Sequence, residues 1–68
     1  MMTDLERYAD ELRAELGAMT AKDLRGYARE HHVALGYATT KAAMRGEIVA
    51  QMRHREYLRM CEEMGVRP

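Results

Sequence analysis

Residues 19–52 read MTAKDLRGYAREHHVALGYATTKAAMRGEIVAQM, and this stretch decides the fold. Thr20 followed by Asp23 is typical of a helix start, because a threonine oxygen accepts a free backbone N–H and negative charge is favourable in the first turn. The residues behind Thr20 place one apolar face at helical spacing and predict a helix over about residues 21–31. That face consists of Leu24, Tyr27, Ala28 and His31.

The helical pattern fails between residues 32 and 39. Val33 and Leu35 are two positions apart, and Gly36 tolerates a positive φ, so an extended connector fits this segment best. Leaving Val33, Leu35 and Tyr37 fully in water would be costly. We therefore expect these side chains to fill the gap between the flanking helices.

A third helix begins after the connector, with Thr39 or Thr40 as its cap. Its first apolar residues recur every four positions, and a second apolar set further on is displaced from the first by more than about a third of a turn. Either the helix breaks near residues 53–55, or it continues to about residue 64 and shows different faces to different neighbours. The first set is Met44, Ile48 and Met52, and the second is Tyr57, Met60, Cys61 and Met64.

The segment before residue 19 predicts one more helix, over residues 3–16. Thr3 and Glu6 have the spacing of a capping box, and Gly17 ends the pattern. The apolar positions between them lie at helical spacing and are separated by charged residues. They are Leu5, Tyr8, Ala9, Leu12 and Leu16.

Together these segments predict a small all-α, three-helix domain over residues 1–68. Its centre is the helix–extended loop–helix unit of residues 20–52, followed by a helical extension over residues 53–65. The sequence has no Trp or Phe but seven Met and four Tyr, which indicates an adaptable core and surfaces suited to partner binding. A chain of 68 residues supports only a small core, so a homodimer is a further possibility.

The central stretch resembles the helix–extended loop–helix group that includes SAP domains, LEM domains and the N-terminal segment of the transcription terminator Rho. The resemblance covers residues 19–52, with a long connector and with Gly46 inside the second helix as departures. It implies nucleic-acid binding if the chain is similar to SAP or Rho members, and protein binding if it is similar to LEM members. The matching residues are Thr20, Leu24, Ala28, Gly36, Arg45, Glu47, Ile48 and Val49.

Charge is distributed unevenly, although the net charge is zero. Residues 1–19 hold two basic and five acidic side chains, whereas residues 20–60 hold eight basic and four acidic ones. Such asymmetry is found in nucleic-acid surfaces and also in ordinary solvated helices. If DNA or RNA is the partner, helix starts and basic side chains would hold phosphates and a connector tyrosine would stack on a base. The candidates are Lys22, Arg25, Tyr37, Thr40, Lys41, Arg45, Arg53 and Arg55.

The alternative is a protein-interaction module, such as a small phage or accessory regulator that docks on a host protein. Its candidate interface is the second apolar set: Tyr57, Met60, Cys61 and Met64. The neutral net charge favours this alternative over a dedicated DNA-binding domain. In a purely structural interpretation, Arg55 and Arg59 pair with Glu62 and Glu63 along the helix, and Tyr37 fixes its loop to the core.

Enzymatic and metal-binding functions find no support in the sequence. The three His residues and Cys61 lack the paired spacing of a zinc site, and no nucleophile has a recognisable base beside it, so we expect neither catalysis nor a cofactor. No run approaches the ~20 apolar residues needed to cross a bilayer. A single cysteine and the absence of an apolar leader favour a cytoplasmic location.

Overall fold

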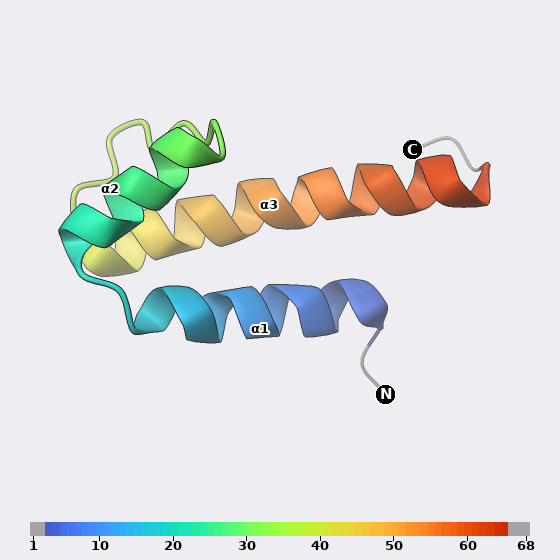
Figure 1. Cartoon of the computed structure of the whole chain (residues 1–68), viewed down its shortest axis with the longest axis horizontal. Helices are drawn as coiled ribbons and strands as arrows, with labels where there is room; N and C mark the ends of the chain where they lie inside the picture. Colours follow the sequence, from blue (N-terminus) through green and yellow to red (C-terminus); the bar gives the residue numbers. More distant parts are fainter. Residues whose placement is uncertain (1–2, 66–68) are drawn as a thin grey trace.

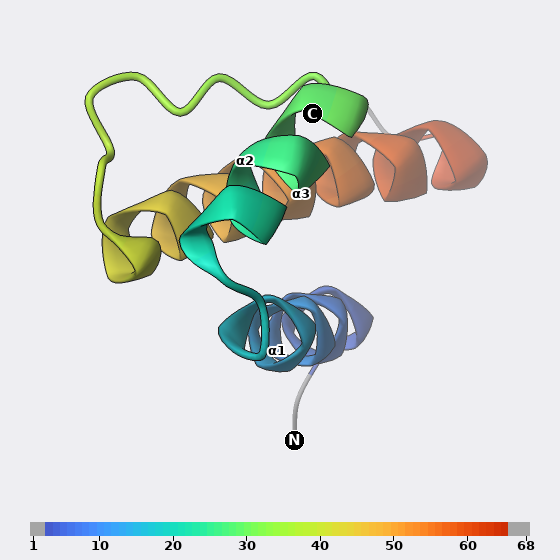
Figure 2. The ribbon, with the colours of Figure 1, turned by 60° about the vertical axis from the view of Figure 1, so that its left-hand side comes forward.

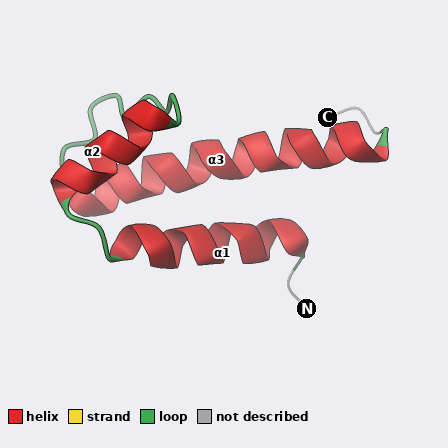
Figure 3. Ribbon diagram, viewed as in Figure 1, coloured by secondary structure: helices red, strands yellow, loops and turns green. Residues whose placement is uncertain are grey.

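A computed structural model describes residues 3–65, which form three helices and no strand (Figures 1 and 3). Helix α1 covers Asp4–Gly17, α2 covers Ala21–Glu30 and α3 covers Lys41–Met64. The prediction of an all-α, three-helix domain with a helix–connector–helix centre is therefore confirmed. Helix α3 is continuous across residues 53–55, so the alternative with a broken helix is wrong.

Helix α3 is the axis on which the other two helices pack. At 1.5 Å per residue its 24 residues span about 36 Å, close to the longest dimension of the molecule, 37 Å. Helix α1 runs antiparallel along α3, and α2 packs on the N-terminal half of α3 (Figure 1). The connector returns from the end of α2 to the start of α3, so both helices begin at the same end of the molecule (Figure 2).

A threonine caps the start of each helix, as the sequence predicts. Thr3, Thr20 and Thr40 each accept a hydrogen bond from the backbone N–H three residues later, at 3.1–3.2 Å. At α2 the capping box is complete, because the Asp23 carboxylate also accepts the N–H of Thr20. The two possible caps of α3 are thus resolved in favour of Thr40.

Thr40→Ala is expected to lower the free energy of unfolding by about 1 kcal/mol, because the substitution leaves the Ala43 N–H without its side-chain acceptor. Thr39→Ala is the matched control, since Thr39 is exposed and lies outside the helix. Urea denaturation followed by circular dichroism measures both variants. Equal losses for the two threonines would contradict the assignment of Thr40 as the cap.

The hydrophobic core lies where all three helices meet. Leu16, Leu24, Met44 and Ile48 are its largest fully buried side chains. No charged or polar residue is buried among the described residues, so the core is held by apolar packing. The other buried members of this cluster are Ala9, Leu12, Ala28, Val33 and Val49.

The connector is fixed at its first half and exposed at its second. Val33 is buried and Leu35 is half-buried, as expected, and the Gln51 side chain of α3 bonds both the N–H and the carbonyl of Ala34. Tyr37, by contrast, is 102% exposed. The expectation that Tyr37 fills the gap between the helices is wrong, because Val33 and Leu35 already fill it and the chain turns outward at Gly36, where φ is +60°.

Tyr8 of α1 and Tyr27 of α2 close the side of the core between these helices. Both are half-buried and line one small surface hollow. Burial raises the pKa of each hydroxyl, and their mutual proximity adds to the effect at Tyr27. The ring of Tyr27 also stacks on His31, with centroids 4.1 Å apart.

Within residues 3–65, none of the helices has the length and apolar character that crossing a lipid bilayer requires.

Candidate nucleic-acid interface

The shared starting end of α2 and α3 carries lysines in the first turn of each helix. Lys22 and Lys41 are both exposed, and neither forms an ion pair among the described residues. The first turn of α3 contains no acidic residue, and the one acid of the first α2 turn, Asp23, is engaged in the capping box. The free N–H groups of two helix starts and two lysines thus create positive potential at this end.

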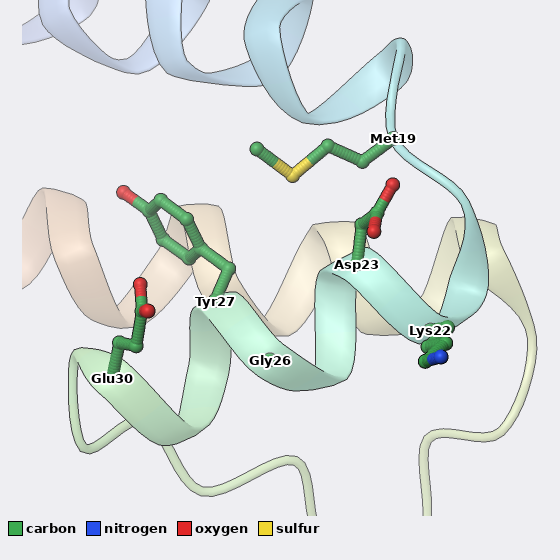
Figure 4. A pocket seen from close by; sticks show the side chains of 6 residues that line it. All are labelled: Met19, Lys22, Asp23, Gly26, Tyr27 and Glu30. Carbon is green, nitrogen blue, oxygen red and sulfur yellow. The ribbon is translucent and has the colours of Figure 1, made fainter.

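The hollow along the outer face of α2 is a poor phosphate site. Figure 4 shows Met19 and Tyr27 closing one side of it, while Asp23 and Glu30 supply its carboxylates. Lys22 stands at the start of the helix, well apart from Glu30 (Figure 4). The carboxylates of Asp23 and Glu30 therefore make this hollow unfavourable for an anion.

Thr40 and Arg45, two of the predicted phosphate contacts, are partly committed to the fold. The Thr40 hydroxyl caps α3. Arg45 is half-buried, and its guanidinium lies 3.5 Å from the position that a Cβ on Gly17 would occupy. It therefore sits beside the C-terminal end of α1, where a positive charge complements the helix dipole.

Arg45 and Arg53 also line a hollow on the side of α3 that faces α1. The structure adds Arg13 of α1 to this group, and Arg13 is held by Asp10 at 2.7 Å. Arg13 was not among the residues predicted from the sequence, because it lies on the acidic first helix and meets Arg45 and Arg53 only through the packing of α1 on α3. Its position in the polar stripe of α1 gave no information about its neighbours.

Arg55 is occupied within the fold. Its guanidinium donates hydrogen bonds to the carbonyl oxygens of His31 and of His32, the latter at 2.6 Å. These carbonyls follow the end of α2, and His32 has a positive φ of 54°. Arg55 thus fastens the end of α2 to α3, and the bonds to the two carbonyls hold its guanidinium in place, whereas Lys22 and Lys41 keep all their donors free of ion pairs in the described residues.

The remaining arginine of this segment forms ion pairs along α3. Arg59 pairs with Glu63 at 2.6 Å and with Glu56 through a second contact, and its hydrogen bond holds the pKa of Glu56 below the ordinary value. The expected pairing of Arg59 with Glu63 is confirmed. Arg55 does not pair with an acid in the described part of the chain, because its guanidinium is bound to the two carbonyls that follow α2.

The C-terminal third of α3 carries the second apolar set on a surface that α2 does not cover. Tyr57 is 41% exposed and Met64 is 73% exposed, whereas Met60 is half-buried and Cys61 is buried. A side-chain hydrogen bond with Cys61 raises the pKa of Tyr57. Leu58, which the helical pattern did not single out, adds to the exposed apolar surface at 36%.

Among residues 3–65, no group of three or more His, Cys, Asp or Glu side chains converges on a point where a metal ion could bind. Comparison of the chain with models of protein families, with curated proteins and with solved structures finds no match. The assignment of a function therefore rests on the chain's own charges and surfaces.

Proposed function

We propose that this protein is a small, non-enzymatic nucleic-acid-binding module that works in the cytoplasm and holds the phosphate backbone. The observation that supports the proposal is the position of two helix starts at one end of the molecule (Figures 1 and 2), each with an exposed lysine in its first turn. The one acid in these two turns, Asp23, is engaged in the α2 capping box. Backbone N–H groups at helix starts and lysine side chains are standard partners of phosphates. The helix–connector–helix arrangement is also compatible with a relationship to SAP domains or to the N-terminal segment of Rho.

Five basic residues are available for phosphates near this end and along the adjoining part of α3, and none forms an ion pair among the residues described. They are Lys22, Arg25, Lys41, Arg45 and Arg53. The acidic side chains of residues 4–15 lie on α1, whereas these five basic residues lie on α2 and α3.

A salt titration tests the proposal. If all five basic residues contact phosphates, the logarithm of the association constant should fall linearly with the logarithm of salt concentration, with a slope of about −4.5 for a duplex and about −3.5 for a single strand. Fluorescence anisotropy with labelled DNA and RNA of both forms measures this slope. Absence of binding to every form at about 20 mM salt would refute the proposal.

A second function, docking on a protein partner, is favoured by the exposed Tyr57, Leu58 and Met64 on the part of α3 beyond α2. Exposed large apolar side chains that lie together on one helix are typical of interaction surfaces. A pull-down from nuclease-treated lysate separates the two functions: a specific partner that is retained after nuclease treatment and lost in Met64→Glu supports protein docking.

A further inference from the structure

Gly46 lies inside α3, where glycine is less favourable than alanine because it loses more backbone freedom on folding. Nothing in residues 3–65 requires glycine there. A Cβ at this position would meet no atom within 4 Å, and the glycines with positive φ in the described part are Gly36 and Gly65. The absence of a side chain at Gly46 leaves the α3 backbone open to a partner that approaches from outside.

Gly46 is shared by two hollows on opposite sides of the exposed α3 face. The hollow toward α1 has a volume of about 340 Å³ and holds Arg13, Arg45 and Arg53. The hollow toward the connector has a volume of about 520 Å³ and includes Leu35, Tyr37 and one acid, Glu47, so phosphates belong on the arginine side and the apolar face of a base on this side. One ligand crossing α3 at Gly46 would therefore meet guanidinium groups on one side and an aromatic ring on the other.

The two sides suit different parts of a nucleotide. Arginine presents a planar fork of donors that matches phosphate oxygens, and Arg45 and Arg53 have no carboxylate partner among residues 3–65. Tyr37 is fully exposed, so no other side chain of the fold covers its ring. Exposed aromatic rings stack on unpaired bases irrespective of sequence.

We propose that the protein binds single-stranded nucleic acid, with the strand crossing α3 at Gly46, its phosphates in the arginine-lined hollow and an unpaired base on Tyr37. This inference rests on the proposed function and specifies the form of the ligand. A duplex is a poorer ligand for Tyr37, because its bases are already stacked and extruding one requires unstacking energy.

The test compares a labelled oligothymidine with an oligothymidine–oligoadenine duplex of equal length by fluorescence anisotropy at low salt. The wild type should bind the single strand more tightly. Tyr37→Ala should weaken single-strand binding about tenfold or more and remove the preference, as expected for one lost stacking contact, whereas Tyr37→Phe should retain it. Tyr37 is outside the core, so these variants remain folded.

Gly46→Ala should change stability and binding in opposite directions. It should raise the melting temperature by a few degrees, because alanine is the better helix former, and should weaken single-strand binding about tenfold by obstructing the approach to the helix. Gly26→Ala is the matched control: a Cβ at Gly26 also meets open space, but this glycine lies beside the acidic hollow of α2. It should raise the melting temperature and leave binding unchanged.

The outcomes separate this inference from the proposed function. Equal binding of single strand and duplex, with no effect of Tyr37→Ala, would overturn the inference and leave phosphate binding intact, and unchanged binding by Gly46→Ala would overturn the crossing point. Absence of binding to either oligonucleotide would remove both proposals. Binding of a polyglutamate peptide in place of the oligonucleotides, with the same sensitivity to Gly46→Ala, would instead assign the surface to an acidic protein.

Discussion

Leu24→Ala is expected to remove most of the stability of the domain. Leu24 is fully buried at the junction of α2 with the other helices, and a truncation at such a site costs about 2–5 kcal/mol through lost apolar burial and the cavity left behind. A domain of 68 residues has a total stability of roughly 3–10 kcal/mol. The variant should therefore be partly or largely unfolded without denaturant.

The composition of the core makes this loss hard to offset. Leu16, Leu24, Met44 and Ile48 are the largest fully buried side chains, and the sequence contains no Phe or Trp that could extend into the cavity. Leu24 also contributes much of the buried surface of α2, because the other buried residue of this helix is the small Ala28. Loss of Leu24 thus weakens the attachment of the whole helix.

Leu58→Ala is the matched control, because the same atoms are removed from a side chain that is 36% exposed and lies outside the core cluster. It should cost less than about 1 kcal/mol. Far-UV circular dichroism during urea denaturation measures the free energy of unfolding of both variants. If Leu24→Ala is too unfolded to measure, Leu24→Met tests the same site, because it nearly conserves volume and should lower the free energy of unfolding by less than about 1.5 kcal/mol. Similar losses at Leu24 and Leu58 would contradict the described core.

Features that depend on neighbours along the chain could be predicted from the sequence. The caps at Thr3 and Thr20 accept hydrogen bonds from N–H groups three residues away, so the capping residue and the helix start that it stabilises lie in one short segment. The same locality explains why the expected helices over residues 3–16 and 21–31 differ from α1 and α2 by no more than one residue at either end.

The continuity of α3 could not be decided from its apolar pattern, because a helical period shows which face is apolar and not which element covers it. Met44 and Ile48 lie in the core shared by all three helices. Further along, Glu56 lies close enough to Tyr8 of α1 for its charge to help raise the tyrosine pKa. The covering element changes along α3, so the apolar face shifts while the helix continues.

The roles of Arg55 and Tyr37 depend on tertiary structure in the same way. Arg55 bonds carbonyls that precede it by 23 and 24 residues, and no local pattern distinguishes it from Arg53. Tyr37 follows the positive-φ residue Gly36, and whether its ring turns toward the core or toward solvent depends on the space that Val33 and Leu35 leave. Candidate sites read from residue type alone therefore included both free and engaged side chains.

Reversing the charge of the two lysines at the shared helix starts is expected to weaken nucleic-acid binding on the order of a hundredfold at about 50 mM salt. Each phosphate contact that is lost changes the salt slope by about 0.9 for a duplex and 0.7 for a single strand, which corresponds to roughly tenfold in affinity at this salt concentration. The variant Lys22→Glu/Lys41→Glu removes two contacts and places negative charge where phosphates would lie. Both side chains are exposed, so the substitutions leave the core intact.

The matched control is Arg7→Glu/Arg59→Glu, which changes the net charge by the same amount at exposed positions on α1 and on the C-terminal part of α3. If the interface is at the helix starts, this control should retain most of the affinity and the full salt slope. The salt slope of the lysine variant should be smaller by the amount that about two phosphate contacts contribute. Urea denaturation of both variants establishes that they are folded. A local binding site responds to where charges are placed as well as to their sum. Equal weakening of binding by the two pairs of substitutions would therefore show that only net charge matters, and would contradict the helix starts as the binding surface.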